Sequence, residues 1–221
     1  MSILDEVIKT YDLRGLVGEQ LTPKVMVALG SAFAEFVNDD EVLIGHDMRP
    51  SSPEFAEAFA FGVNAFGKKV RMLGLCSTDQ TYFASGSLNL PAVMFTASHN
   101  PASYNGIKFS KAGAQGISYD TGLAEIKEIA KGYLEKPLEV SQPNITHYDS
   151  LEDYANYLKQ LVRVSDSQLK VVVDAANGMG GHTVPAVLGG LGLVPMYFEL
   201  DGTFPNHEAN PLDPKNLVDL Q

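Results

Sequence analysis

The feature that most constrains the fold is a regular alternation of helical segments with short apolar segments. Apolar side chains at helical spacing predict helices over residues 23–37 and 53–66. Short apolar runs at residues 42–45, 70–74 and 92–95 predict strands between and after them. This order indicates βαβ units. We therefore expect an α/β fold with a mixed, mainly parallel sheet flanked by helices.

The same pattern returns after a polar interruption. Residues 136–146 contain two prolines and are typical of a linker. After it we expect a helix over 151–164, a buried strand over 169–174, a helix over 183–191 and a strand over 194–198. We expect one complete domain over residues 1–140 and an incomplete second α/β domain of the same type over residues 141–221, with the chain stopping inside an expected helix.

Charge and composition exclude several classes of function. The chain has 221 residues, a length typical of one to two domains, and a net charge of −11. It has no run rich in Lys and Arg, so we expect no nucleic-acid partner. Cys76 is the single cysteine, which rules out an internal disulfide and a cysteine metal site. The N-terminus lacks the features of a signal peptide, and no apolar run reaches the roughly 20 residues that span a bilayer. These features favour a cytoplasmic protein without a membrane partner.

A polar loop follows the apolar run at 92–95. Pro101 has no N–H to continue a ladder, so the strand must end before it. Asn105-Gly106 is a strong turn signal, and a strand is expected to resume at 107–109. The loop therefore presents its side chains between two rigid elements, as binding and catalytic loops often do.

Ser98, His99 and Lys108 are the chemically useful groups of this loop. On residue chemistry alone, Ser98 is a helix cap, a surface hydroxyl or a nucleophile. It does not lie in a Gly-x-Ser-x-Gly elbow, which disfavours a serine hydrolase. We also expect no Ser98–His99 dyad, because adjacent side chains rarely face each other. His99 remains either a proton carrier or an imidazole that orients the loop.

Other candidate residues have simple structural explanations. Arg14 lies in the segment Tyr11-Asp-Leu-Arg-Gly15, either as a surface arginine in a turn or as a cation reaching into a cleft. Asp47 and Arg49 follow an expected strand, and we favour a mutual ion pair or a cap of the next helix, with Ser52 as its N-cap. The glycines of 175–181 indicate a β–α turn rather than a phosphate cradle.

Two motifs give the chain a family resemblance. Thr96-Ala-Ser-His-Asn-Pro101, followed by Tyr104-Asn-Gly-Ile-Lys108, resembles the phosphoserine loop of the α-D-phosphohexomutases, the phosphomannomutases and phosphoglucomutases. Tyr11-Asp-Leu-Arg-Gly15 is similar to the N-terminal motif of the same family. The resemblance implies that Ser98 carries a phosphoryl group, that Arg14, His99 and Lys108 line the active site, and that Tyr11 helps bind substrate. It does not assign the general base.

The resemblance also implies Mg²⁺, held between the phosphoserine oxygen and the aspartates of an Asp-x-Asp-x-Asp-Arg loop. That loop is missing from this sequence, so Ser98, through its phosphate, is the only expected metal contact. The chain matches the first half of the family pattern, as one domain and the opening of a second. We expect the N-terminal portion of a mutase that interconverts hexose 1-phosphate and 6-phosphate, of mannose or glucose, through a bisphosphorylated sugar. We expect little activity from this portion alone.

One alternative is a non-catalytic binding or interaction module built from the same domain. Such a module would self-associate through the sheet edge and apolar surface that further domains would cover.

Overall fold

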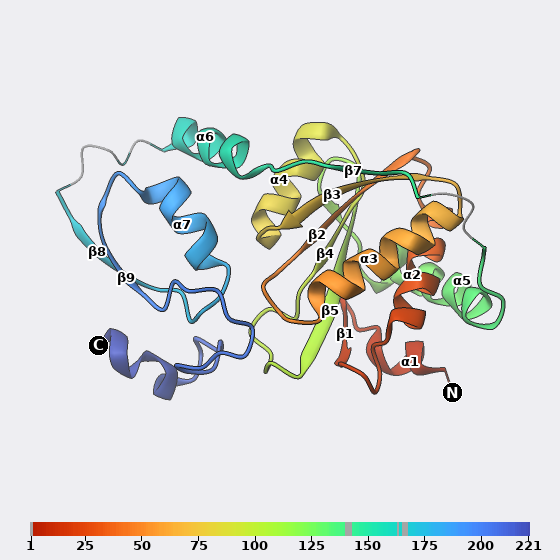
Figure 1. The fold of residues 1–221 in the computed structure, drawn as a ribbon, viewed down its shortest axis with the longest axis horizontal. Helices are drawn as coiled ribbons and strands as arrows, with labels where there is room; N and C mark the ends of the chain where they lie inside the picture. Colours follow the sequence, from red (N-terminus) through yellow and green to blue (C-terminus); the bar gives the residue numbers. More distant parts are fainter. Residues whose placement is uncertain (1, 140–142, 163, 165–167) are drawn as a thin grey trace.

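The computed structural model describes residues 2–139, 143–162, 164 and 168–221. It contains two α/β units side by side, a larger one formed by the first part of the chain and a smaller one containing the C-terminus (Figure 1). The predicted α/β class and the mixed sheet are confirmed.

The larger sheet has a parallel centre and an antiparallel side. Its strand order is β1 (Leu13–Leu16), β5 (Tyr104–Lys111), β4 (Ala92–Phe95), β2 (Glu41–His46), β3 (Lys69–Leu75) and β7 (Ile145–His147). Strands β4, β2, β3 and β7 are parallel neighbours, whereas β5 runs antiparallel to β4, to β1 and to the short strand β6 (Gln115–Gly116). The parallel strands bring their carboxyl ends to one edge of the sheet.

Helices cover both faces of this sheet. The larger core joins it to α1 (Ile3–Val7), α2 (Pro23–Phe36), α3 (Ser52–Ala65) and, after the π-helical turn η1 (Tyr119–Leu123), to α5 (Ala124–Glu135). A smaller cluster lies under α4 (Thr78–Leu88). Strand β4 shows the alternation expected of a strand buried on both faces, because Val93 and Phe95 enter the larger core while Met94 enters the smaller one.

Two helices begin at side-chain caps, and the cap predicted for a third is wrong. Thr22 Oγ1 accepts the Val25 N–H at 3.4 Å, and Ser77 Oγ accepts the Gln80 N–H at 3.2 Å. The N-cap of α3 is Ser51 instead of Ser52. The Ser52 hydroxyl is buried and donates to Asp47 Oδ1 at 2.6 Å, so it serves the preceding loop instead of the helix.

The turn predicted at Asn105-Gly106 is wrong, because both residues lie inside β5. A glycine is needed at position 106 because the backbone of the neighbouring strand passes close to it, and not because the chain turns there. A Cβ at this position would lie 2.2 Å from Leu13 O, in the paired strand β1. Asn105 is fully buried and hydrogen-bonded to serines near the start of α3.

The second unit consists of α6 (Leu151–Leu161), β8 (Lys170–Asp174), α7 (Gly180–Leu188), β9 (Gly192–Met196) and the 3-10 helix η2 (Pro214–Leu220). Strands β8 and β9 are parallel. The prediction that β8 is buried is wrong, because Val172 is 46% exposed in a sheet of only two strands. The expected domain boundary at residue 140 lies outside the described residues. The end of the predicted linker forms β7, an edge strand of the first sheet.

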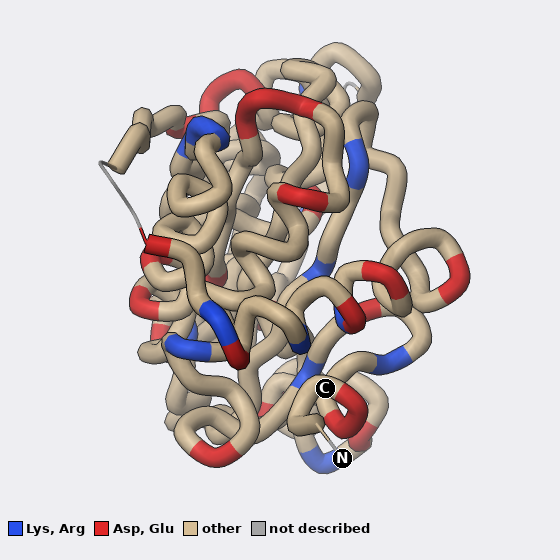
Figure 2. The backbone as a smooth tube through the Cα atoms, turned by 90° about the vertical axis from the view of Figure 1, so that its right-hand side faces the viewer, with Lys and Arg blue, Asp and Glu red and all other residues tan. Residues whose placement is uncertain are grey.

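Charged residues are spread over the molecule. Figure 2 shows acidic residues on many loops and helices of the visible side, with basic residues interspersed among them. None of the helices in the described part of the chain is both long and apolar enough to cross a membrane.

Candidate active site

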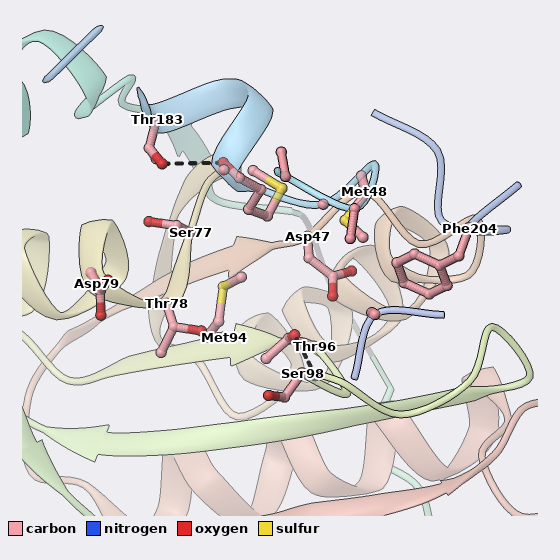
Figure 3. A pocket seen from close by; sticks show the side chains of 16 residues that line it. Asp47, Met48, Ser77, Thr78, Asp79, Met94, Thr96, Ser98, Thr183 and Phe204 are labelled. Carbon is pink, nitrogen blue, oxygen red and sulfur yellow. Dashed lines mark hydrogen bonds between the residues drawn. The ribbon is translucent and has the colours of Figure 1, made fainter. Parts of the chain in front are cut away.

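A cavity of about 410 Å³ lies between the two units, at the carboxyl ends of parallel strands. Residues that follow four strands line it, among them Asp47 after β2, Ser77 after β3, Ser98 after β4 and Ala175 after β8. Figure 3 shows Thr183 and Phe204 of the second unit on the same cavity as Ser98 and Thr96. The fold therefore collects polar loops from distant parts of the chain at one place.

Ser98 is exposed at this cavity and has an unusual backbone. Its φ is 54°, a conformation that residues with a side chain rarely adopt. Its N–H donates to Thr96 Oγ1 at 3.0 Å. Its Oγ lies 3.3 Å from His99 Nδ1, so the prediction that these side chains do not face each other is wrong. The left-handed conformation at Ser98 explains the difference, because it turns the chain sharply between the two residues.

The two predicted cations meet at one carboxylate. Arg14 Nε lies 2.9 Å and Lys108 Nζ 3.3 Å from Asp12 Oδ2. Arg14 Nη1 also donates to the side-chain oxygen of Asn100, in the Ser98 loop. The antiparallel pairing of β1 with β5 produces this arrangement, since it sets Arg14 opposite Gly106. Tyr11 is 75% exposed.

Asp47 and Arg49 form the ion pair that the sequence favours. Arg49 Nε lies 3.3 Å from Asp47 Oδ2, and both side chains are buried. Burial lowers the pKa of Arg49, and the charge of Asp47 opposes this shift. His46 Nδ1 lies 2.9 Å from the backbone oxygen of the next residue, Asp47, so the contact of this imidazole is local.

The glycine-rich segment after β8 forms the β–α turn that was expected. A Cβ at Gly181 would lie 2.0 Å from Phe198 O, so close packing of backbone against backbone requires this glycine. Gly178 and Gly180 line the cavity. Gly181 is therefore explained by packing within the turn, without a phosphate-binding role.

The residues present do not fit a Mg²⁺ site. No group of three or more His, Cys, Asp or Glu residues suitable for a metal occurs in the described ranges. Asp47 lines the cavity, but its carboxylate accepts from Ser52 and pairs with Arg49. Mg²⁺ needs several oxygen ligands in near-octahedral geometry, and Ser98 Oγ offers one.

Some residues at the cavity gave no signal in the sequence. Phe204 and Thr183 reach it only because the second unit lies against the first. Thr96 was recognised as part of a motif, but its hydrogen bond to the Ser98 N–H was not predicted.

Comparison with known protein families gives two adjacent matches. Residues 5–136 match the phosphoglucomutase/phosphomannomutase α/β/α domain I, and residues 152–221 match domain II of the same family. Individual relatives agree. The chain is 37% identical over 215 residues to the phosphohexose mutases of Xanthomonas campestris pv. campestris, covering 94% of this chain and 47% of the relative. It is 33% identical over 218 residues to a phosphomannomutase of Escherichia coli, covering 94% and 48%.

A solved structure supports the same relationship. A phosphoglucomutase/phosphomannomutase family protein from Burkholderia thailandensis superposes with a TM-score of 0.86 at 31% identity, covering 99% of this chain and 49% of that one. The chain thus spans about half the length of the relatives it matches.

Proposed function

The chain belongs to the phosphoglucomutase/phosphomannomutase family, and from this we propose that it forms the phosphoryl-carrying part of a hexose-phosphate mutase. The intact enzyme would interconvert the 1-phosphate and 6-phosphate of mannose or glucose. In this proposal residues 1–140 are the first mutase domain and residues 141–221 begin the second.

One observation carries the proposal: the exposed hydroxyl of Ser98 faces a cavity, and its loop is bound to a pair of cations. Arg14 donates to Asn100 in the loop, and both Arg14 and Lys108 pair with the carboxylate of Asp12. A phosphoserine would carry a charge of about −1.5 to −2 near neutral pH. Two cations at this end of the sheet favour such a charge, and positioning with electrostatic stabilisation is the main source of phosphoryl-transfer catalysis.

The chemical step is a transfer between two oxygens. The bond from phosphorus to Ser98 Oγ breaks while a bond from phosphorus to a sugar hydroxyl oxygen forms, and the hydroxyl proton leaves to a base. The bisphosphorylated sugar then returns its other phosphoryl group to Ser98. His99 is a candidate for proton movement, because its ring lies beside the Ser98 oxygen. We assign no step to Mg²⁺, since the described residues do not provide its ligands.

Intact mass spectrometry tests the role of Ser98. After incubation with glucose 1,6-bisphosphate and Mg²⁺, we expect a gain of about 80 Da, one phosphoryl group, that phosphatase removes. Ser98→Ala should abolish the gain, whereas Ser103→Ala, at an exposed serine of the same loop, should keep it. A gain that maps to another residue, or no gain in the wild-type protein, would refute the proposal.

We also propose that these 221 residues alone turn over little hexose phosphate, because they correspond to about half of their relatives' length. A coupled assay with glucose 1-phosphate, glucose 1,6-bisphosphate and Mg²⁺ checks this point. Sustained conversion to glucose 6-phosphate would contradict it.

A second candidate function, a non-catalytic interaction module, is favoured by a groove between α6 and α7. The groove of about 250 Å³ is lined mostly by apolar side chains, including Leu158 and Val187, and Leu161 in it is 61% exposed. Size-exclusion chromatography over a range of protein concentrations tests this alternative. It predicts a dimer that Leu161→Glu dissociates, whereas a concentration-independent monomer would argue against it.

A further inference from the structure

We propose that Arg49 is a positioning residue that holds the Ser98 loop in its reactive shape, and that Phe204 of the second unit secures it there. The proposal rests on the proposed role of Ser98. Its geometric part, the clamping of the loop, can be tested separately.

The guanidinium of Arg49 binds backbone carbonyl groups along the whole Ser98 loop. Its side chain is 0% exposed. Nη2 donates to Ser98 O at 2.9 Å and to Asn100 O at 2.7 Å. Nη1 donates to Pro101 O at 2.8 Å and to Tyr104 O at 2.9 Å. The whole turn from Ser98 to Tyr104 is thus wrapped around one planar cation.

Only arginine fits this arrangement. Four carbonyls converge on the two terminal nitrogens, and Nε faces Asp47 Oδ2 at 3.3 Å. Guanidinium offers five N–H donors in a rigid fork, whereas the lysine ammonium offers three from a single point. Lysine would keep the charge and leave carbonyl oxygens without a donor.

A buried polar network holds Arg49 itself. Asp47 Oδ1 accepts from the Arg49 backbone N–H at 3.0 Å and from Ser52 Oγ at 2.6 Å. Asn105 Nδ2 donates to Ser52 Oγ at 3.0 Å. Because Asn105 lies in β5 and Asp47 follows β2, the network connects Arg49 to the ends of both strands.

The second unit lies directly on Arg49. The centroid of the Phe204 ring is 5.1 Å from Arg49 Cζ, within range of a cation–π contact. A Cβ at Gly202 would lie 2.6 Å from Arg49 Cα, so the segment carrying Phe204 passes in close contact. Figure 3 shows Phe204 on the opposite side of the cavity from Thr78. In this proposal the ring, lying over the guanidinium, shields from water the hydrogen bonds that shape the loop.

The loop needs such support because its conformation is unfavourable by itself. Ser98 has a φ of 54°, and residues with a side chain hold such geometry only where the surroundings enforce it. Release of the four carbonyls would let Ser98 relax and move its hydroxyl relative to Arg14 and Lys108. Phosphoryl transfer depends on that placement.

Hydrogen exchange measured by NMR tests the clamp without reference to activity. In Arg49→Lys we expect the amides of Ser98, Asn100 and Tyr104 to exchange at least about tenfold faster than in the wild type, while amides of β2 and β4 stay unchanged. Arg71→Lys is the matched control, because Arg71 is also paired with a carboxylate, that of Glu41. Wild-type exchange at the three loop amides in Arg49→Lys would overturn the proposal.

Phosphorylation of Ser98 by glucose 1,6-bisphosphate adds a functional readout. In Arg49→Lys we expect its maximal rate to fall at least about 100-fold, with the concentration for half-maximal rate nearly unchanged. An unchanged maximal rate would overturn the positioning role. Absence of phosphorylation in the wild type would refute the proposed function, and the exchange data would still decide whether Arg49 holds the loop.

Phe204→Ala keeps the test decisive if Arg49→Lys does not fold. It leaves every guanidinium hydrogen bond in place and removes only the covering ring. We expect about threefold faster exchange at the same three amides. Phe66→Ala, which removes another ring from beside a cation, that of Lys68, should leave them unchanged. Equal exchange in both variants would contradict the role of Phe204.

Discussion

Cys76 shows how strongly a single side chain depends on its surroundings. It is fully buried, with Sγ 3.2 Å from Thr81 Oγ1 and 4.0 Å from Met94 Sδ. Burial raises the pKa of the thiol to about 11, against the smaller opposing effect of the hydrogen bond to Thr81. The thiolate is the reactive form, so the folded protein holds this cysteine in an unreactive state.

We therefore expect Cys76 to react with a disulfide reagent such as DTNB only when the protein opens. At about pH 8 the native protein should release thionitrobenzoate at its unfolding rate, independently of reagent concentration. The same protein in denaturant should react within seconds and serves as the control. Fast stoichiometric reaction of the native protein would contradict the buried position.

His207 makes the second unit sensitive to pH. Its protonated ring donates from Nε2 to Asp174 Oδ2 and from Nδ1 to Glu208 O, each at 2.9 Å. Burial lowers the pKa of His207, but the two hydrogen bonds together with the negative charges of Asp174 and Asp219 outweigh it and raise the pKa above 6.5. The raised pKa means that protonation stabilises the fold. This stabilisation is complete below pH 6.5 and is lost as the pH rises through the raised pKa.

An NMR titration of the His207 ring should give a midpoint above that of a free histidine, and Asp174→Asn should lower it. The melting temperature of the wild type should fall over the same pH interval, and this part of the fall should be missing in His207→Asn. A midpoint at or below 6.5 in the wild type would contradict the ion pair.

At the residue scale, the sequence indicated candidate side chains but not the contacts that those side chains make. Arg14, Lys108 and Ser98 were expected from their motifs. In the structure Arg14 and Lys108 meet at Asp12, and Arg14 also contacts Asn100 in the Ser98 loop. The hold of Arg49 on the loop was not predictable, because its carbonyl partners lie about fifty residues further along the chain. Gly106 was misassigned for a similar reason, since the backbone that requires a glycine there belongs to β1.

At the scale of elements, α2 and α3 pack through glycines. A Cβ at Gly62 would lie 2.0 Å from Val27 O, and one at Gly30 would lie 2.1 Å from Phe59 O. The two helices are therefore in backbone contact, where neither can move away without disturbing the core they cover.

We expect Gly62→Ala to lower the free energy of unfolding by about 3 kcal/mol, since the added methyl group meets backbone instead of a flexible side chain. Gly132→Ala in α5 is the matched control, because a Cβ at Gly132 would have no neighbour within 4 Å beyond its own stretch of helix backbone. It should raise the free energy of unfolding by about 0.5 to 1 kcal/mol through helix propensity. Denaturant unfolding measures both, and equal effects would contradict the backbone contact.

The helices and central strands were predictable because their apolar periodicity is local. The edge strand β7 was not, since its three residues are all exposed and carry no apolar pattern. Its place in the sheet comes from parallel pairing with β3, in which Val70 is set opposite Ile145.

At the scale of the whole molecule, the hydrophobic core is unevenly distributed. Every fully buried hydrophobic residue of the described chain lies between Leu4 and Ala155. Between residues 168 and 221, the buried residues other than glycine are the polar Asn177 and Asn216. Parallel sheets are ordinarily covered on both faces, and a sheet of two strands is marginal by itself.

We therefore expect the two units to open at different free energies, because opening follows the amount of apolar surface that each buries. In hydrogen exchange measured by mass spectrometry, peptides from β2 and β4 should exchange only through global unfolding. Peptides from β8 and β9 should exchange at least about 100-fold faster. Leu43→Ala, in the core under the first sheet, should speed exchange of the β2 and β4 peptides and so reduce the difference in exchange rate between them and β8. Val172→Ala, at a 46% exposed position, should leave exchange of the β2 and β4 peptides unchanged. Equal protection of β8 and β4 in the wild type would show that the second unit is stabilised as strongly as the first, against the distribution of buried side chains.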